Sequence, residues 1–280
     1  MMNLTLNTQN LTLGLQSSPP LGGTILRIDM HCHTAEGSLD ARVSIFTVVD
    51  ILKSKGYDGV LVTDHNSYRG YEAWEESGRD DFVVLKGIEY DTGDAGHMLV
   101  ILPKDVDTSI FSLRGMPVFK LIRLVHRLGG IVGPAHPYAY CKFGMFNHRK
   151  WLRNSALCYN FDFVEVFNSC ATALSNFLAA RLAARFSRPV FGGSDNHRLS
   201  GIGLGFTDIM ADIRNNDDLL AALAAKSPCR AQGRYNLNSF AIAHSFLYSC
   251  SSYIYYYLYN KGMALLMTRR RRKAQRTMAL

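Results

Sequence analysis

Two histidines separated by a single residue constrain this chain more than any other feature of its sequence. They are His31 and His33, in the stretch DMHCH at residues 29–33, and an apolar pair at 25–26 leads into it. Side chains alternate between the two faces of a β-strand, so we expect His31 and His33 to point one way and Cys32 the other. Two neutral imidazoles held side by side on a strand form half of a metal site.

Apolar runs recur along the chain and predict seven strands. They span residues 24–30, 59–63, 82–88, 98–102, 130–134, 161–167 and 189–193. Helical patterns are found at 43–55, 116–128, 171–186 and 217–225. Strands that alternate with helices favour a parallel sheet with crossover connections, which indicates a barrel or a doubly wound sheet.

One connection is too short for a parallel crossover. Only seven residues separate Glu89 from His97, and a crossover needs a dozen or more. We therefore expect the third and fourth strands to form an antiparallel hairpin that places His97 beside Glu89. This expectation favours a distorted barrel.

Polar motifs stand at or near the ends of these strands. After the HxH pair come TDHN at 63–66, GIE at 87–89, GH at 96–97, AHP at 135–137, VEV at 164–166 and GSDNH at 193–197. Six of the nine histidines lie in these motifs. Sites in α/β proteins gather at the carboxyl ends of the strands, so the motifs predict a single metal site.

The motifs together resemble the PHP (polymerase and histidinol phosphatase) superfamily of metal-dependent phosphoesterases. DMHCH, TDH, GIE, GH, AHP and GSDNH occur in the order of that family and span roughly residues 24–210. The resemblance implies an α/β fold, a distorted (β/α)7 TIM-like barrel with one antiparallel strand and with the metal site at the strand C-terminal ends. That architecture agrees with the number of predicted strands.

The resemblance also implies two or three divalent metal ions (Zn, Mn or Fe), and the ligand types do not decide among these metals. A first metal would be held by His31, His33, Glu89 and Asp195. Glu89 would bridge to a second, completed by His97 and His136. His65, His197 and Asp40 would hold a third, with Glu36 as the alternative to Asp40 because the spacing of this ligand varies in the family.

The implied reaction is hydrolysis of a phosphoric ester, in which a metal-bound hydroxide attacks phosphorus. Asp195 or His197 would take the proton from the water, and the sequence leaves both open. Arg198 and Asn66 are the candidate substrate-binding residues. Arg69 and Lys86 are alternative phosphate clamps, and Lys86 lies inside a predicted strand, where a structural role is the alternative.

Three functions follow from these expectations. The first is hydrolysis of a small phosphomonoester or a nucleotide. The second is an exonuclease or nucleotide 3′-phosphatase that acts on nucleic acid, and the third is a non-catalytic metal-binding regulatory domain. The net charge of +8 falls to +2 once residues 269–276 are set aside, and this weakly basic remainder favours a small substrate over nucleic acid.

The rest of the chain predicts a simple organisation. Residues 1–24 form a flexible leader, 25–228 the metallo-hydrolase barrel, 229–268 a Tyr-rich extension and 269–280 a basic disordered tail. The six cysteines show no CxxC spacing, which is typical of reduced thiols in a cytoplasmic protein. No apolar run reaches the ~18 residues of a membrane-spanning helix. The oligomeric state is left open.

Overall fold

The computed structural model describes residues 6–7, 10–13, 24–139, 143–152, 155–237 and isolated positions between 250 and 265. Most of the predicted leader, most of the Tyr-rich extension and the whole basic tail lie outside the described residues. No helix among the described residues is both long and apolar enough to span a membrane.

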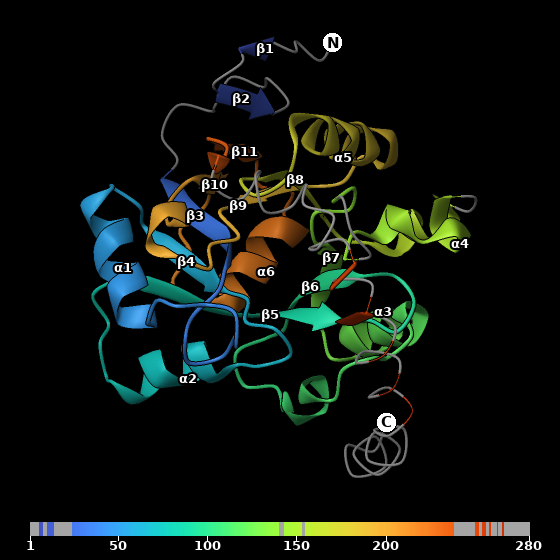
Figure 1. The fold of residues 1–280 in the computed structure, drawn as a ribbon. Coiled ribbons are helices and arrows are strands. Elements are labelled where there is room, and N and C mark those ends of the chain that lie inside the picture. Colours follow the sequence, from blue (N-terminus) through green and yellow to red (C-terminus); the bar gives the residue numbers. More distant parts are fainter. Residues whose placement is uncertain are drawn as a thin grey trace.

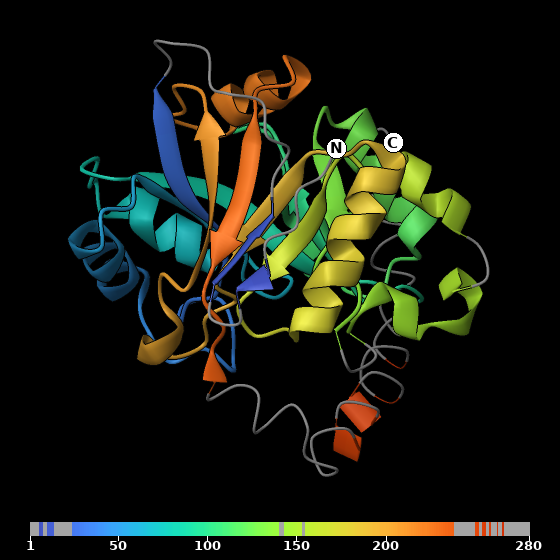
Figure 2. The same ribbon diagram turned by 90° about the horizontal axis from the view of Figure 1, so that it is seen from above.

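Two sheets form the centre of the molecule. One has the strand order β1-β2-β11-β10-β3-β4-β5-β6-β7 and the other pairs β8 with β9. The strands are β1 Leu6–Asn7, β2 Asn10–Leu13, β3 Ile25–Cys32, β4 Gly59–Val62, β5 Val83–Asp91, β6 His97–Ile101, β7 Ile131–Pro134, β8 Val164–Asn168, β9 Val190–Gly193, β10 Gly205–Met210 and β11 Cys229–Gly233. The larger sheet curls around the centre of the fold, and Figure 2 shows β3, β10 and β11 lying side by side at one end of it.

The seven predicted strands correspond to β3 through β9. β3, β4 and β5 run parallel to one another, and all four residues of β4 are buried, as expected for a strand covered on both faces. The predicted hairpin is confirmed, because β6 runs antiparallel to β5 and to β7. Its register pairs Asp91 with His97 and Glu89 with Leu99.

The architecture differs from the prediction in two respects. β1, β2, β10 and β11 were not predicted. β10 pairs antiparallel with β3, and β11 pairs antiparallel with both β10 and β2. Burial alternates along β10, so this strand lacks the continuous apolar run that marks the buried strands. The structure confirms a mixed α/β fold with a curled half-barrel sheet, but it does not confirm a closed (β/α)7 barrel.

The two sheets are joined by a few polar contacts. Near β7 and β8, the Asp162 amide donates to the Val132 carbonyl at 2.9 Å, and an Asp162 carboxylate oxygen accepts from the Val132 amide at 2.8 Å. At the other edge, the Asp195 amide after β9 donates to the His31 carbonyl on β3 at 2.8 Å. These contacts bring the ends of β3, β7, β8 and β9 to one place.

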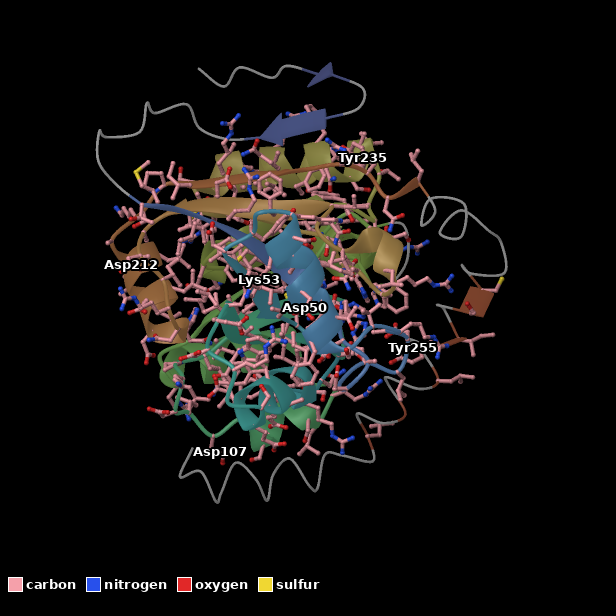
Figure 3. The ribbon with its side chains drawn as sticks, turned by 90° about the vertical axis from the view of Figure 1, so that its left-hand side faces the viewer. Asp50, Lys53, Asp107, Asp212, Tyr235 and Tyr255 are labelled. Atoms are coloured by element: carbon pink, nitrogen blue, oxygen red, sulfur yellow. The ribbon has the colours of Figure 1, made fainter. Side chains whose placement is uncertain are left out.

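Within the described residues 24–237, six α-helices surround the sheets (Figure 1). They are α1 Ile45–Ser54, α2 Arg69–Glu76, α3 Val118–Arg127, α4 Arg149–Leu152, α5 Ala173–Phe186 and α6 Asn216–Ala224. α1 buries Val48, Val49 and Leu52 and exposes Asp50 and Lys53 on its outer face, which Figure 3 shows. This two-faced pattern is what the helical spacing of its apolar residues predicts.

Candidate metal centre

The carboxylate of Glu89, on β5, lies at the centre of a ring of imidazoles. Its Oε1 is 2.8 Å from His97 Nδ1 and 2.9 Å from His136 Nε2. Its Oε2 is 3.2 Å from His33 Nε2, 3.2 Å from His65 Nδ1 and 3.4 Å from His31 Nε2. The side chain is 1% exposed. A buried carboxylate whose two oxygens face different sets of imidazoles has the geometry of a bridging metal ligand.

The HxH pair lies as the strand alternation predicts. The two Nε2 atoms of His31 and His33 are 3.1 Å apart, and Cys32 packs on the other side in an apolar cluster with Val43 and Ile45. Asp195, which follows β9, brings its Oδ1 to 3.2 Å from His33 Nε2 and 3.6 Å from His31 Nε2. The structure therefore brings together the four residues predicted for the first metal.

A hydrogen bond at Nδ1 fixes the orientation of each imidazole, that of His31 and that of His33. His31 Nδ1 is 2.9 Å from Glu165 Oε1, and a carboxylate there accepts the Nδ1 proton. His33 Nδ1 is 3.1 Å from the Ser38 hydroxyl, which itself donates to Asp64. Because that hydroxyl has a single proton, His33 must donate to it. Both histidines then direct the Nε2 lone pair into the site, as a metal ligand requires.

Asp29 and Asp64 precede histidines of the site, and they accept hydrogen bonds from backbone amides rather than from imidazoles. Asp29 accepts from the amides of His31 at 3.2 Å and Ser194 at 2.8 Å. Asp64 accepts from the Thr34 amide at 2.7 Å and acts on the imidazole of His33 only through Ser38. They shape the loops that carry the ligands.

The residues predicted for the second metal meet at one oxygen of Glu89. His97 comes from the start of β6 and His136 from the loop after β7, and both face Glu89 Oε1. Asp91 was not predicted at the site, yet its Oδ1 is 3.3 Å from His97 Nε2 and 3.6 Å from His65 Nδ1. Asp91 lies two positions beyond Glu89 on β5, so the strand presents both carboxylates on one face.

The residues predicted for the third metal also lie together. Asp40 Oδ2 is 3.3 Å from His197 Nε2 and 3.7 Å from His65 Nε2. Glu36, the alternative ligand, is instead placed at the start of α1, where its carboxylate accepts from the Ile45 amide at 3.1 Å. The geometry therefore favours Asp40 over Glu36.

The site carries backbone strain. Three of the five described non-glycine residues with positive φ belong to it: Asn66 at 51°, His136 at 28° and Asp195 at 49°. Each follows a strand, and a left-handed conformation turns the chain sharply there. Such strain costs of order 1–3 kcal/mol per residue and is typical of functional sites.

Charge is concentrated in the site. Burial disfavours the ionised form of Glu89, but the imidazoles of His97, His65 and His31 hold its pKa well below the usual range. Burial also works to lower the pKa of His31, while the carboxylates of Glu165, Asp195 and Glu89 raise it well above its usual value. The imidazolium and carboxylate groups thus stabilise one another when no metal is bound.

The donor set fits divalent metal ions. Donor groups from His31, His33 and Glu89 lie within 4.8 Å of one another, and the same limit holds for His65, Glu89 and His97 and for His33, His65 and His197. His65 Nδ1, His97 Nε2, His136 Nδ1 and Asp91 Oδ1 are buried without a hydrogen-bond partner. Buried polar groups are nearly always paired, so such orphans indicate a missing ion or water.

The candidate substrate-binding residues are dispersed. Asn66 is buried beside the site, where its Oδ1 accepts from the Asp91 amide at 3.0 Å. Arg198 is exposed and immediately follows His197. Arg69 is exposed on α2, two positions beyond Ser67, whose Oγ accepts from the Arg69 amide.

Lys86, the other alternative phosphate clamp, contacts residues outside the candidate metal centre. Its ammonium group donates to the Lys104 carbonyl, and its amide donates to Asn216 at 2.8 Å. These contacts support the structural alternative for this residue rather than a phosphate clamp.

Three residues at the site had no role in the predicted set, namely Ser38, Asp91 and Glu165. Glu165 had a visible signal, since it is an acidic residue inside an apolar strand, and a buried charge needs a partner. Asp91 had a weaker one, because it shares the face of Glu89 on the same strand. Ser38 had no signal in the sequence.

Comparisons with known proteins give one family match and several structures of similar fold. A family profile described as PHP-associated matches residues 173–228. Comparison with curated protein sequences gives no match.

Several solved structures share the fold. A protein from Bifidobacterium adolescentis assigned as a metal-dependent phosphoesterase is 19% identical, with a TM-score of 0.54 over 74% of this chain and 97% of that chain. PsfC from Pseudomonas syringae is 16% identical, with a TM-score of 0.57 over 83% and 98%. A lesion-specific endonuclease from Pyrococcus furiosus is 16% identical, with a TM-score of 0.54 over 72% of this chain and 56% of that chain. At these identities the likeness is one of fold. The match to the PHP-associated profile is confined to residues 173–228, and the solved structures add a shared fold.

Proposed function

We propose that this chain is a metal-dependent phosphoesterase that hydrolyses a small phosphomonoester or a nucleotide and uses two or three divalent ions. The observation that carries the proposal is the position of Glu89, whose two carboxylate oxygens face two sets of imidazoles within 2.8–3.4 Å. The fold shared with a protein assigned as a metal-dependent phosphoesterase supports the same class of reaction.

The ligand assignment follows the geometry of the site. We assign the first metal to His31, His33, Glu89 and Asp195, the second to Glu89, His97 and His136, and the third to His65, His197 and Asp40. Divalent ions bound there would supply Lewis acidity, which makes water more acidic and draws charge from a phosphoryl group.

The chain contributes a proton acceptor at the same place. Asp195 Oδ1 is 3.7 Å from His197 Nδ1, and Asn168 fixes the other carboxylate oxygen with a 3.1 Å hydrogen bond. The His197 side chain is 30% exposed and that of Asp195 is 13% exposed. We assign the role of taking a proton from the attacking water to Asp195. His197 Nδ1 lies 3.1 Å from the Asp195 carbonyl and donates its proton there, which leaves only Nε2 for the third metal.

The test is phosphate release by the metal-reconstituted protein from sugar phosphates, histidinol phosphate and nucleotides. Asp195→Asn is expected to lower kcat/KM by about 10²–10⁴-fold, the usual contribution of a positioned base. His136→Ala is expected to lower both activity and metal content. Glu76→Gln, at the exposed end of α2, is the control and is expected to behave as wild type.

Two results would overturn the proposal in different ways. Activity unchanged in Asp195→Asn would contradict the site assignment. Metal bound at two or more equivalents with no release from any ester would instead favour a non-catalytic metal-binding domain.

A second candidate function is cleavage of nucleic acid, favoured by the fold shared with a lesion-specific endonuclease. This chain matches only 56% of that protein. Cleavage of single-stranded or damaged DNA that weakens steeply with salt, and that is lost when residues 269–280 are deleted, would support this alternative. Equal activity of the truncated chain on small esters would support the small substrate.

A further inference from the structure

A polar cavity of about 360 Å³ opens beside the candidate metal centre. It lies between the segment that follows β4, the first turns of α2 and the 3-10 helix η1 Ser109–Ser112. Its lining residues are Gly37, Asn66, Ser67, Tyr68, Arg69, Glu72, Thr108, Ser109 and Ser112. The volume falls in the range of small-molecule sites.

Two lining residues join the cavity to the metal centre. Asn66 directly follows His65, and its side chain accepts from the amide of Asp91 at 3.0 Å. Gly37 precedes Ser38, whose hydroxyl lies 3.1 Å from His33 Nδ1 and accepts from the His65 amide at 3.0 Å. A substrate whose phosphate sits at the metals on the His65 side therefore has this cavity next to it.

The cavity is bordered by polar groups that lack partners within the protein. Asn66 is 6% exposed and Tyr68 is 7% exposed, yet Asn66 Nδ2 and the Tyr68 hydroxyl have no hydrogen-bond partner. Burying such a group unpaired costs about 1–3 kcal/mol. Thr108 precedes η1, and its hydroxyl does not cap that helix. Asn66 and Tyr68 thus line the cavity and each carry a buried polar atom without a partner.

The chemistry of the lining indicates the ligand. Every lining residue other than Gly37 carries a polar side-chain atom. Hydroxyl and amide groups both donate and accept, the Glu72 carboxylate accepts from hydroxyl groups, and the Arg69 guanidinium donates to oxygen. A ligand with several neighbouring hydroxyl groups satisfies this mixture, because each hydroxyl is both a donor and an acceptor.

We propose that this cavity binds the leaving group of the substrate and that this group is polyhydroxylated, as in a sugar or polyol phosphate. The inference rests on the proposed phosphoesterase function and adds to it the class of alcohol that is released. Asn66, predicted from its position as a substrate-binding residue, would then contact the alcohol rather than the phosphate.

The test compares two esters of primary alcohols that carry the same phosphate group, glucose 6-phosphate and cyclohexylmethyl phosphate, on the metal-reconstituted full chain. The sugar ester is expected to have a kcat/KM at least about tenfold higher, since one lost hydrogen bond to a charged group is worth about that factor. Thr108→Val and Glu72→Gln are each expected to lower the ratio of kcat/KM for the sugar ester to that for the cyclohexylmethyl ester about tenfold, mainly through a higher KM for the sugar ester.

The control is Glu76→Gln, which makes the same change one turn along α2, at an exposed position outside the cavity lining. It is expected to keep the wild-type ratio. A wild-type ratio in both cavity variants, or equal kcat/KM for the two esters, would overturn the cavity inference while leaving the phosphoesterase proposal intact. No release from either ester, or from the wider set of substrates, would overturn both.

Discussion

Single hydrogen bonds from residues distant in the sequence determine which ring nitrogen a proposed ligand histidine directs into the site. The Glu165 carboxylate on β8 holds Nδ1 of His31 on β3, 134 residues away in the sequence. It is buried at 1% exposure and also accepts from Asn168 and from the His136 amide. Glu165 therefore contacts both β3 at His31 and the loop after β7 at His136, and we assign it a positioning role.

Replacing Glu165 with glutamine removes its charge and keeps its shape. A neutral amide is a poorer acceptor for the His31 Nδ1 proton, so His31 becomes a weaker ligand. We expect the dissociation constant for divalent metal to rise about 10–100-fold, as is typical when the hydrogen-bond partner of a metal-ligating histidine is lost. Competition against a chelating dye measures this constant, with Glu76→Gln as control. An unchanged constant would show that Glu165 serves packing alone.

At the same scale, the sequence predicted which histidines gather at the site better than it predicted the residues that hold them in place. His31, His33, His65, His97, His136 and His197 were found because each stands in a short local motif, and the structure brings all six together with Glu89. Ser38 was not found, because its hydrogen-bond partners become visible only after the chain has folded. Asp91 was not found, because the predicted strand ended at residue 88, whereas β5 extends to Asp91. His126 stands outside these motifs, and it pairs with Asp162 near the surface.

At the scale of elements, the site depends on β3 and β9 lying very close together. Gly193 ends β9, and a Cβ placed there would be 2.3 Å from His31 Cβ and 2.5 Å from the His31 nitrogen. Only glycine permits this approach. It lets the segment after β9 deliver Asp195 to the HxH pair, although the two strands belong to different sheets.

Gly193→Ala should therefore separate the two segments. We expect a loss of about 1–3 kcal/mol in the free energy of unfolding, the usual cost of forcing extra volume into a packed interior. Metal affinity should fall with it, because Asp195 moves away from His31 and His33. Urea denaturation and metal titration measure the two effects. Wild-type values in both would contradict the proposed dependence on this contact.

The sequence predicted the strands that are buried on both faces and missed those that are not. β3 to β9 were found from apolar runs, and the antiparallel hairpin was found from the length of one connection. β10 and β11 were missed because their burial is mixed. β11 pairs with β10 although it begins at residue 229, where the Tyr-rich extension was predicted to start.

At the scale of the whole molecule, the centre of the fold is a charged cluster whose state depends on pH and metal. Five of its imidazoles have a pKa raised above 6.5 in the folded chain, namely those of His31, His33, His65, His136 and His197. Glu89 and Asp195 have pKa values lowered from 4.5 and 3.8. Carboxylates and imidazolium groups therefore stabilise the metal-free fold together.

The sign of the pH dependence follows from these directions. The histidines stabilise the fold fully below pH 6.5, and this contribution is lost as pH rises through their raised folded values. The carboxylates stabilise it above pH 4.5, and their contribution is lost as pH falls through their lowered values. We expect the Tm of the metal-free protein to be highest between pH 4.5 and pH 6.5. It should decrease as the pH rises through the raised histidine pKa values and as it falls through the lowered carboxylate pKa values.

Metal should reverse this trend, because a bound ion replaces the protons on the imidazoles. The increase in Tm on adding metal should therefore grow from pH 5.5 to about pH 8, near the ordinary histidine range. Thermal unfolding of chelator-treated and reconstituted protein measures it. A metal effect that shrinks with pH would contradict the assignment of these histidines as ligands.

The most direct test of the account is the metal content of Glu89→Gln compared with wild type, measured by elemental analysis after reconstitution and removal of free ions. Glu89 is assigned to two metals, and the third set of His65, His197 and Asp40 does not include it. We predict two or three equivalents of divalent metal per chain in wild type and in Glu76→Gln, and at most one in Glu89→Gln. Wild-type metal content in Glu89→Gln would contradict the bridging role of this carboxylate and the assignment built around it.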